Sequence, residues 1–426
     1  MLFEHWRQIA HACASQIALR DLTRGGQWTQ WTFGQLAAAV EPASRTQAPM
    51  AFPQSDSAEF IFNVLRAWRS GQIVCPLEPG QVAPIIGGEL PPGAVHIKST
   101  SATTGAPRLV VFTAAQLMAD AENIVSTMGL RPDWPNLGVI SLAHSYGFSN
   151  LVLPLLLHGI PLLLVGAALP EALRRAATLE EAVTLPAVPA LWRAWHEAGA
   201  IPGHVRLAIS AGAPLPVALE RSIFEAGGLK IHNFYGSSEC GGIAYDATAE
   251  PRLEGACAGA PLRNVRVSVG DDGCLQVSGP AVAETYWPEP SPKLRASLFH
   301  TSDLAEICDG VIYLRGRASD QINVAGRKVS PEKIEEVLAT HPQVRECLAF
   351  GVPSADAERG ETIVACVALK AEVKGETLKQ FAMTKLPDWQ VPREWWLVES
   401  LEANRRGKFL RAEWRRRYLE KAGSRR

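Results

Sequence analysis

Between residues 28 and 237 the sequence alternates between short apolar runs and longer amphipathic runs, and this alternation constrains the fold more than any other feature. The run 58–70 has apolar side chains at helical spacing, and it is followed by Gly71, a residue type that commonly ends helices. Residues 136–144 are a predicted strand, and residues 216–228 are a predicted helix. Strands that alternate with helices predict a layered α/β core with a largely parallel sheet.

The pattern of the sequence changes near Asn264. From there, short segments in which apolar and polar residues alternate are separated by turn residues. The runs 271–273 (Asp-Asp-Gly) and 309–310 (Asp-Gly) stand between such segments and predict β-hairpins. The C-terminal part then predicts a smaller α+β unit with a basic tail. We expect the junction in the segment GRASDQ, which divides the chain into domains 1–316 and 317–426.

The segment Leu151 to Pro170 is apolar enough to suggest a membrane-spanning helix. Pro154 and Pro161 interrupt it, however, and His158-Gly159 predicts a turn between its two Leu-rich halves. We therefore expect a buried helix, a turn and a buried strand, and no membrane span.

Composition excludes several classes of protein. The formal net charge of −1 provides no overall field that would attract nucleic acid or a membrane surface. The eight cysteines form no C-x-x-C pair, which favours reduced thiols over disulfides or zinc. The first residues carry Glu4, His5 and Arg7 where a secretory signal needs an apolar run, so we expect a cytoplasmic protein.

A loop rich in hydroxyl groups, STSATTGAP, lies between two strand-like runs within residues 96–113. Small residues let a backbone approach a ligand closely, and their N–H groups and hydroxyls can surround phosphate oxygens. The loop does not have the G-x-x-x-x-G-K-[ST] spacing of the Walker phosphate-binding loop. Taken alone, the loop is equally typical of an ordinary Ser/Thr-rich turn.

Four further segments carry candidate chemical groups. Glu239 follows a predicted strand and a glycine, a position that suits a Mg²⁺ ligand. Asp303 and Arg317 could bind a ribose diol and its phosphate, and Lys408 follows a glycine in a basic loop. Each of these residues alone is more typical of an ordinary surface or hairpin position.

In order and spacing, these five segments resemble the adenylate-forming superfamily of AMP-dependent synthetases and ligases, which includes acyl- and aryl-CoA synthetases. TSATTGAPR is similar to its phosphate loop T-S-G-T-T-G-x-P-K, YGSSE to Y-G-x-T-E, and TSDL to T-G-D-L. GRASDQINVAGRKVSPEKIEE and RRGKFLR are similar to two further motifs of that superfamily. The resemblance spans nearly the whole chain.

The resemblance implies an α/β fold with a large N-terminal domain of layered α/β sheets and a small β-barrel-like subdomain. A small, mobile α+β C-terminal domain that carries the catalytic lysine would follow. It implies an AMP-forming acid–thiol ligase that uses ATP, Mg²⁺ and CoA, or a carrier-protein phosphopantetheine in place of CoA. A carboxylic acid would become acyl-AMP with release of pyrophosphate, and the acyl group would then pass to a thiol.

Carried over position by position, the resemblance assigns the phosphate loop first. Thr103 and Glu239 would hold Mg²⁺, and Ser101, Thr104 and Gly105 would line the pyrophosphate.

The nucleotide would be bound farther along the chain. Ser238 would touch the α-phosphate, Tyr235 would stack on adenine, and Asp303 and Arg317 would bind the ribose hydroxyls. The remaining nucleotide-binding positions would be Gly212, Ala213, Pro214 and Gly236.

The catalytic and mobile parts complete these assignments. Lys408 would reach the α-phosphate and the acyl carboxylate, and His144 would gate the acyl site. Gly326 and Lys328 would approach the thiol acceptor after a rotation of the small domain, for which Ser319 occupies the hinge position.

Four positions depart from the superfamily pattern. Ala102 replaces a loop glycine, Arg108 replaces the loop lysine, and Ser302 replaces the glycine before Asp303. Ser319 stands where the hinge residue is usually aspartate. None of these changes removes Glu239, Asp303, Arg317 or Lys408, so we expect an active enzyme.

The expected acyl pocket favours an aryl or fatty acid over an amino acid, because the stretch HSYGFSNLVLPLLL has no acidic side chain to hold an ammonium. Its expected residues are Tyr146, Phe148, Ser149, Cys240 and Gly241. The thiol that accepts the acyl group could belong to CoA or to an acyl carrier protein.

Two other interpretations remain. AISAG around Ser210 nearly matches the nucleophile elbow of serine hydrolases, with His232 and His300 farther on. The chain could also be an inactive nucleotide-binding homologue.

Overall fold

A run of parallel strands forms the centre of the large unit, as the alternation predicts. The computed structural model describes residues 1–22, 28–41, 47–99, 108–354, 360–401 and 411–423. Neighbouring parallel strands follow the order β11-β10-β9-β7-β8-β1. Their bounds are Ile17–Asp21 (β1), Asn136–Gly138 (β7), Leu162–Leu164 (β8), Val183–Ala187 (β9), Val205–Ser210 (β10) and Ile231–Ser237 (β11). Strand β2 (Thr29–Thr32) pairs antiparallel with β1 at the edge.

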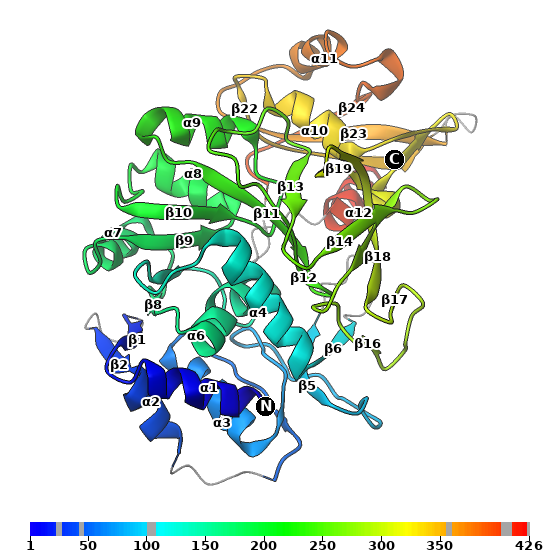
Figure 1. The fold of residues 1–426 in the computed structure, drawn as a ribbon. Coiled ribbons are helices and arrows are strands. Elements are labelled where there is room, and N and C mark those ends of the chain that lie inside the picture. The colour runs from blue at the N-terminus through cyan, green and yellow to red at the C-terminus, as the bar shows by residue number, and fades with distance from the viewer. Residues whose placement is uncertain (23–27, 42–46, 100–107, 355–359, 402–410, 424–426) are drawn as a thin grey trace.

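Helices cover both faces of this sheet (Figure 1). On one side lie α7 (Pro170–Ala177), α8 (Pro189–Glu197) and α9 (Val217–Gly227), which share a core with the strands through Trp192, Trp195 and Ile223. A second core contains the other helices, whose bounds are Leu2–Ala12 (α1), Phe33–Val40 (α2), Ala58–Ser70 (α3), Ala114–Met128 (α4) and Leu153–His158 (α6). The sheet is therefore buried on both faces, which explains why its strands read as apolar runs.

A second sheet contains the two strands that flank the hydroxyl-rich loop in the sequence. Its strand order is β16-β6-β5-β4-β3, with bounds Thr285–Trp287 (β16), Leu109–Thr113 (β6), Ala94–Ser99 (β5), Ile73–Val74 (β4) and Met50–Ala51 (β3). Strands β5 and β6 pair antiparallel, with Ser99 opposite Leu109. The loop thus connects two adjacent antiparallel strands, as its β-branched flanks predict.

The region after Asn264 extends the large sheet as an antiparallel run. Its strands are β12 (Gly241–Tyr245), β13 (Cys257–Pro261), β19 (Val311–Arg317), β18 (Leu298–Cys308), β15 (Cys274–Ser278) and β14 (Arg266–Val269), in that spatial order, and β17 (Leu294–Arg295) also pairs with β18. Both expected hairpins form, β14–β15 and β18–β19. At the second turn Asp309 and Gly310 both have positive φ, the backbone that a tight two-residue hairpin requires.

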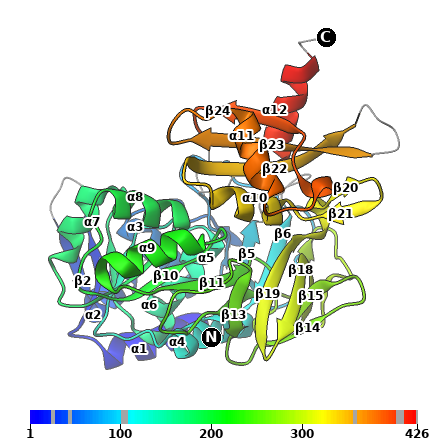
Figure 2. The same ribbon diagram turned by 90° about the horizontal axis from the view of Figure 1, so that it is seen from above.

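The C-terminal residues form a separate α+β unit (Figure 2). It contains the hairpin β20 (Ile322–Val324) and β21 (Arg327–Val329), helix α10 (Pro331–Ala339) and the sheet β22-β23-β24. The remaining bounds are Val344–Pro353 (β22), Glu361–Leu369 (β23), Gly375–Met383 (α11), Glu394–Val398 (β24) and Arg411–Gly423 (α12). Its two apolar cores draw on no described residue before Ile322. The division at residues 316 and 317 stays a prediction from the sequence.

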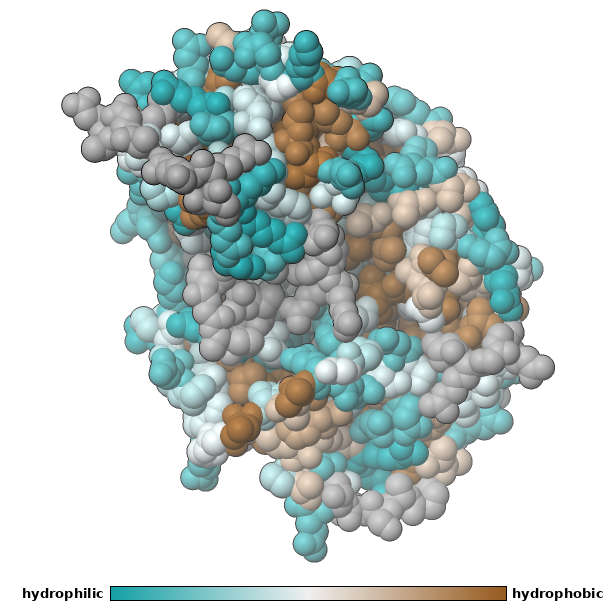
Figure 3. All heavy atoms as spheres, turned by 180° about the vertical axis from the view of Figure 1, so that it is seen from behind, coloured by the Kyte–Doolittle hydropathy of each residue, from teal (hydrophilic) through white to brown (hydrophobic). Residues whose placement is uncertain are grey.

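The apolar segment Leu151 to Pro170 is a buried helix, a turn and a strand, as predicted. A π-helical turn at Phe148–Val152 leads into α6, and β8 follows. In the described part of the chain, no helix is long and apolar enough to cross a membrane. On the face seen in Figure 3, apolar side chains gather in separate patches among hydrophilic ones.

Candidate active site

The carboxyl ends of parallel strands bring several of the predicted residues to one edge of the large sheet. Gly212 to Pro214 follow β10, and Ser238 and Glu239 follow β11. His144 follows β7 and precedes the short helix α5 (Ser145–Gly147). Ligands bind at this edge in open α/β sheets, because the loops there converge while the strands hold them rigidly.

Asp303 links two other predicted residues. The Tyr235 hydroxyl donates to Asp303 Oδ2 at 2.5 Å, and Arg317 Nε donates to Oδ1 at 3.0 Å. Asp303 and Arg317 are direct partners across β18 and β19, so the sheet register sets their distance. Three residues from separate motifs therefore form one polar group.

Electrostatics hold this group in a defined protonation state. Burial and the neighbouring Asp303 carboxylate raise the pKa of the Tyr235 phenol well above 10, so the phenol remains a hydrogen-bond donor. Burial lowers the pKa of Arg317, but the charges of Asp303 and Asp320 outweigh it and raise that pKa overall. The phenol and the guanidinium therefore both stay protonated as donors to Asp303 across the neutral pH range.

Glu239 is held by a tyrosine that the sequence reasoning missed. The Tyr286 hydroxyl donates to Glu239 Oε1 at 3.0 Å, and the Glu239 backbone N–H donates to Ser237 Oγ at 3.2 Å. The guanidinium carbon of Arg108 lies 5.0 Å from the centre of the Tyr286 ring. Tyr286 therefore connects the end of the phosphate loop to the predicted metal ligand.

This arrangement fits a bound Mg²⁺. One carboxylate oxygen of Glu239 accepts from Tyr286, and a carboxylate offers about four lone-pair sites in all. Mg²⁺ needs only one or two carboxylates, because water and phosphate oxygens complete its shell. Tyr286 would therefore orient the Glu239 carboxylate and leave room on it for the Mg²⁺ ion.

Ser238 contacts the loop that carries His144. Its hydroxyl lies 2.9 Å from Ser145 Oγ, and the Tyr146 N–H donates to His144 Nδ1 at 3.3 Å. This second contact caps helix α5 and fixes the direction of the His144 ring. The structure thus brings the predicted α-phosphate residue next to the predicted gating residue.

The expected acyl-pocket residues are all buried: Tyr146, Phe148, Ser149, Cys240 and Gly241. Behind them lies a polar group that the sequence reasoning missed. Ser149 Oγ donates to Asp120 Oδ2 at 2.6 Å and accepts from Lys98 Nζ at 3.3 Å, and the Lys98 and Asp120 charges are 3.9 Å apart. The HSYGF stretch has no acid of its own, but Asp120 from α4 reaches it.

Gly241 is required at this point of the pocket. It has a φ of 69°, and a Cβ there would overlap the Asp120 carboxylate. Asp120 Oδ1 accepts from the N–H of Gly242 at 3.1 Å. The turn after Glu239 therefore packs directly against the acid.

Other predicted residues lie elsewhere or outside the described ranges. Gly236 pairs with Gly242 across β11 and β12, while Gly326 and Lys328 lie on the β20–β21 hairpin of the small unit. The Ser319 hydroxyl donates to Asp320 in the 3₁₀ turn Ala318–Asp320. Five predicted residues lie outside the described ranges: Ser101, Thr103, Thr104, Gly105 and Lys408. The departure at Ala102 lies there too.

The hydrolase interpretation fails on geometry. Ser210 is fully buried within β10, and its hydroxyl has no hydrogen-bond partner among the described residues. His232 Nδ1 instead contacts the backbone oxygen of Asp246 at 2.9 Å, and His300 Nε2 pairs with Asp272 at 3.1 Å. A nucleophile needs an exposed hydroxyl beside a base, and Ser210 has neither.

Comparison with known proteins agrees with this arrangement. Residues 95–287 match the family described as AMP-binding enzyme, and residues 333–408 match the AMP-binding enzyme C-terminal domain. A probable 2-succinylbenzoate–CoA ligase of Mycobacterium tuberculosis is 30% identical over 79% of this chain and 88% of its own. A feruloyl-CoA synthase of Amycolatopsis is 29% identical over 75% of this chain and 69% of its own.

A solved structure has the same fold. The o-succinylbenzoate CoA synthetase of Bacillus subtilis, in complex with its acyl-adenylate intermediate, has a TM-score of 0.83 at 21% identity and covers 96% of this chain and 97% of its own. Another structure of that synthetase contains ATP and a magnesium ion. The chain belongs to the AMP-binding enzymes of the adenylate-forming superfamily. Within that class it is an AMP-forming acid–thiol ligase, which activates a carboxylic acid with ATP and passes the acyl group to a thiol.

Proposed function

We propose that the chain converts an aryl or fatty carboxylic acid, rather than an amino acid, into its CoA thioester through acyl-AMP. The observation that carries this proposal is the convergence of two polar groups on β11, Tyr235–Asp303–Arg317 and Tyr286–Glu239. Two similar proteins, a feruloyl-CoA synthase and a 2-succinylbenzoate–CoA ligase, are named for acids with an aromatic ring, which favours an aryl acid here.

The difficulty of the first step is electrostatic. A carboxylic acid with a pKa near 4 is already ionised at pH 7, so no general base is needed. Two like charges about 4 Å apart repel by about 4 kcal/mol at an effective dielectric constant near 20. Positive charge at the α-phosphate must offset this repulsion, and we assign that role to Lys408.

The other roles follow from the positions of the side chains. Glu239 and Thr103 would hold Mg²⁺, which neutralises phosphate charge when it is bound. Asp303 would accept from the ribose hydroxyls, with Arg317 and Tyr235 fixing its orientation. Ser238 would donate to the α-phosphate from the loop that Ser145 supports.

We propose CoA as the acceptor of the acyl group, because the similar feruloyl-CoA synthase and 2-succinylbenzoate–CoA ligase are both named for CoA thioester formation. Gly326 and Lys328 on the β20–β21 hairpin would approach CoA after a rotation of the small unit. An acyl carrier protein is the alternative thiol donor. The cytoplasmic location stays a prediction from the sequence.

The rotation would separate a contact that the structure contains. The Gly255 N–H donates to Glu336 Oε1 of α10 at 3.3 Å, which joins the large unit to the small one. This hydrogen bond is long and is therefore a weak restraint on a change of arrangement. Ser319 lies in the turn between the two units and is the proposed hinge.

Acid-dependent exchange of pyrophosphate into ATP tests the proposal. We expect exchange with at least one acid of an aryl and fatty panel, and thioester formation when CoA is added. Absence of exchange with every acid would contradict the proposed function and favour an inactive homologue. Thioester formation only with a carrier protein would contradict the choice of CoA.

The variant Lys408→Ala separates the two steps. Adenylation should fall about 10²- to 10³-fold, since a charge at the α-phosphate is removed. Conversion of supplied acyl-adenylate with CoA should be largely unaffected. Lys421→Ala, on α12, is the matched control and should leave both steps unchanged. Equal loss of both steps in Lys408→Ala would contradict a role confined to adenylation.

A further inference from the structure

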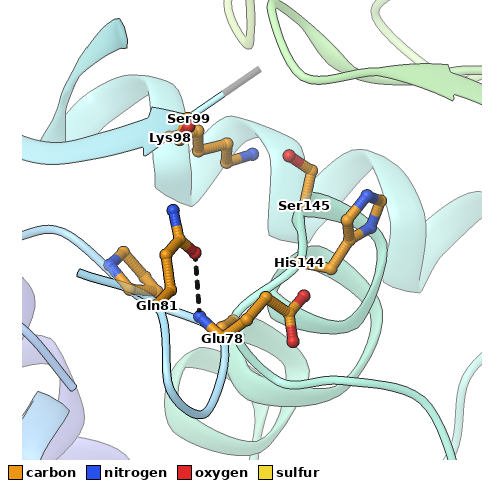
Figure 4. Close-up of a pocket in the computed structure, with 8 residues that line it drawn as sticks. Glu78, Gln81, Lys98, Ser99, His144 and Ser145 are labelled. Atoms are coloured by element: carbon orange, nitrogen blue, oxygen red, sulfur yellow. Dashed lines mark hydrogen bonds between the residues drawn. The ribbon is translucent and has the colours of Figure 1, made fainter. Parts of the chain in front are cut away.

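A cavity beside the candidate site has a buried amine in its wall (Figure 4). The side chains that matter here are Glu78, Gln81, Lys98, Ser99, His144 and Ser145. In Figure 4 the Lys98 amine points toward Ser145, with Gln81 and Glu78 on the opposite side. Only 4% of the Lys98 side chain is exposed, so any molecule in this cavity would meet its amine in a largely dry environment.

The cavity adjoins the proposed reaction centre. Ser145 lies in its wall and contacts Ser238, at 2.9 Å between the two hydroxyl oxygens. Lys98 also interacts electrostatically with Glu239 and Cys240. As it stands the cavity has room for about one water molecule, so an acid whose carboxylate lay near Ser238 would bring its tail against Lys98 as the side chains of the cavity wall move apart.

Lys98 is incompletely satisfied by its neighbours. An ammonium has three N–H donors, and the only hydrogen bond that Lys98 makes within the described residues is the 3.3 Å contact with Ser149 Oγ. Asp120 is 3.9 Å away, beyond hydrogen-bond range, and the third neighbour is the Phe112 ring at 4.6 Å. A buried donor without a partner costs free energy, which a ligand oxygen would recover.

The charges around the cavity decide which kind of oxygen fits. Asp120 and Glu239 both act electrostatically on Lys98, and Glu78 lies in the wall of the same cavity. A second carboxylate on the substrate tail would add a further negative charge to this group. A neutral oxygen accepts the same N–H without that repulsion. Burial lowers the pKa of Lys98, and a neutral amine still donates N–H.

We infer that Lys98 donates a hydrogen bond to a neutral oxygen (a hydroxyl, ether or carbonyl) on the tail of the acid substrate. This inference rests on the proposed function and names the class of acid within it. Asp120 and Ser149 act as positioning residues, because they hold the amine at the cavity wall without facing the ligand themselves.

Matched sets of acids test the inference with the intact protein. The sets are benzoate, 4-hydroxybenzoate and terephthalate, and cinnamate, 4-hydroxycinnamate and 4-carboxycinnamate. In the unchanged enzyme we expect the hydroxylated acid to have the highest kcat/KM of its set in pyrophosphate exchange. The variant Lys98→Met should reduce the hydroxylated-to-parent ratio about 10- to 100-fold, as expected for a hydrogen bond to a charged donor.

A second variant guards against misfolding. Lys98→Met alone removes the cation beside the buried Asp120 carboxylate, which keeps its hydrogen bonds from Ser149 and Gly242 but loses its charge compensation. Such a loss destabilises proteins. The double variant Lys98→Met/Asp120→Asn removes that charge and keeps an acceptor for the Gly242 N–H. Its circular dichroism spectrum and melting temperature should stay close to those of the unchanged enzyme, while the hydroxylated-to-parent ratio stays low.

The outcomes separate the two proposals. If no acid supports exchange in the unchanged enzyme, the proposed function fails. If exchange occurs but neither variant changes the ratio, or all acids lose activity equally, Lys98 has only a structural role and the inference is wrong. A preference of the unchanged enzyme for terephthalate or 4-carboxycinnamate would also overturn it.

Discussion

At the scale of the residue, the candidate site depends on carboxylates whose orientation is set by a neighbouring phenol. Tyr235 donates to Asp303, and Tyr286 donates to Glu239. Both phenols have raised pKa values, because they are buried and lie beside a carboxylate. Glu239 accepts from Tyr286 on one oxygen, and Asp303 accepts one hydrogen bond on each oxygen, from Tyr235 and Arg317. Because a carboxylate has about four lone-pair sites, each of them can also accept from a ligand.

Asp303→Ala should weaken ATP use. Loss of hydrogen bonds from the ribose to a charged acceptor is worth about 1.5–3 kcal/mol, so kcat/KM for ATP should fall about 10- to 100-fold, mainly through KM. Steady-state kinetics with varied ATP would measure this. Glu306→Ala is the control, since Glu306 pairs with Arg315 across the same two strands at the surface. A similar effect of both variants would argue against a ribose contact.

At the scale of the element, Arg411 joins three parts of the small unit. Its guanidinium pairs with Glu335 of α10 at 2.9 Å, with Glu332 at 3.0 Å, and with Asp320 of the junction turn at 2.7 Å. Arg411 is the last residue of RRGKFLR, the motif that contains Lys408. The start of α12 is therefore tied to the junction turn, and these elements should move as one body.

Arg411→Met should destabilise the small unit. Burial raises the pKa of Glu335, and removal of the guanidinium would leave that carboxylate buried without its partner. Breaking such a pair costs about 3–5 kcal/mol. Hydrogen exchange of α10 and α12 should speed up accordingly.

The matched control is Arg416→Met on the same helix. Arg416 is exposed and pairs with the surface residues Glu413 and Glu420, so its loss should cost less than about 1 kcal/mol. Indistinguishable exchange in the two variants would show that Arg411 is not the tie between these elements.

The elements and motif residues were predictable because their signals are local. Tyr235 and Glu239 follow a strand that the sequence marks clearly, and hairpin geometry brings Asp303 to Arg317. Lys98 and Asp120 were not predictable, because their contact depends on the packing of β5 against α4. A lysine beside the apolar Ile97 in a strand was the local signal of that polar group.

At the scale of the whole molecule, neutral buried histidines link stability to pH. Burial lowers the pKa of His96 well below 6.5, and burial also lowers the pKa values of His158 and His232. Below about pH 6.5 the unfolded chain binds protons that the folded chain does not, so stability falls as pH falls. The fully buried His96 contributes up to about 1.4 kcal/mol per pH unit in that window. The partly buried His158 and His232 contribute less, because solvent screens them.

The melting temperature should therefore drop between pH 7.5 and pH 5.5, and His96→Leu should reduce the drop. Leucine loses no hydrogen bond, since neither ring nitrogen of His96 has a partner among the described residues. Thermal unfolding at both pH values measures the effect, with His11→Leu at the surface as the control. If the melting temperature of His96→Leu fell between pH 7.5 and pH 5.5 as much as that of the unchanged protein, His96 would not be a source of the pH dependence.

The close approach of Gly241 to Asp120 also restricts how the protein can evolve or be engineered. Any side chain at position 241 would overlap the Asp120 carboxylate, and the positive φ adds strain for every residue type except glycine. The two positions are therefore epistatic: a change at 241 is tolerated only in a background where 120 has already become smaller. Directed evolution toward new acids should reach this wall of the pocket through position 120 first, and libraries that vary position 241 alone should yield inactive proteins.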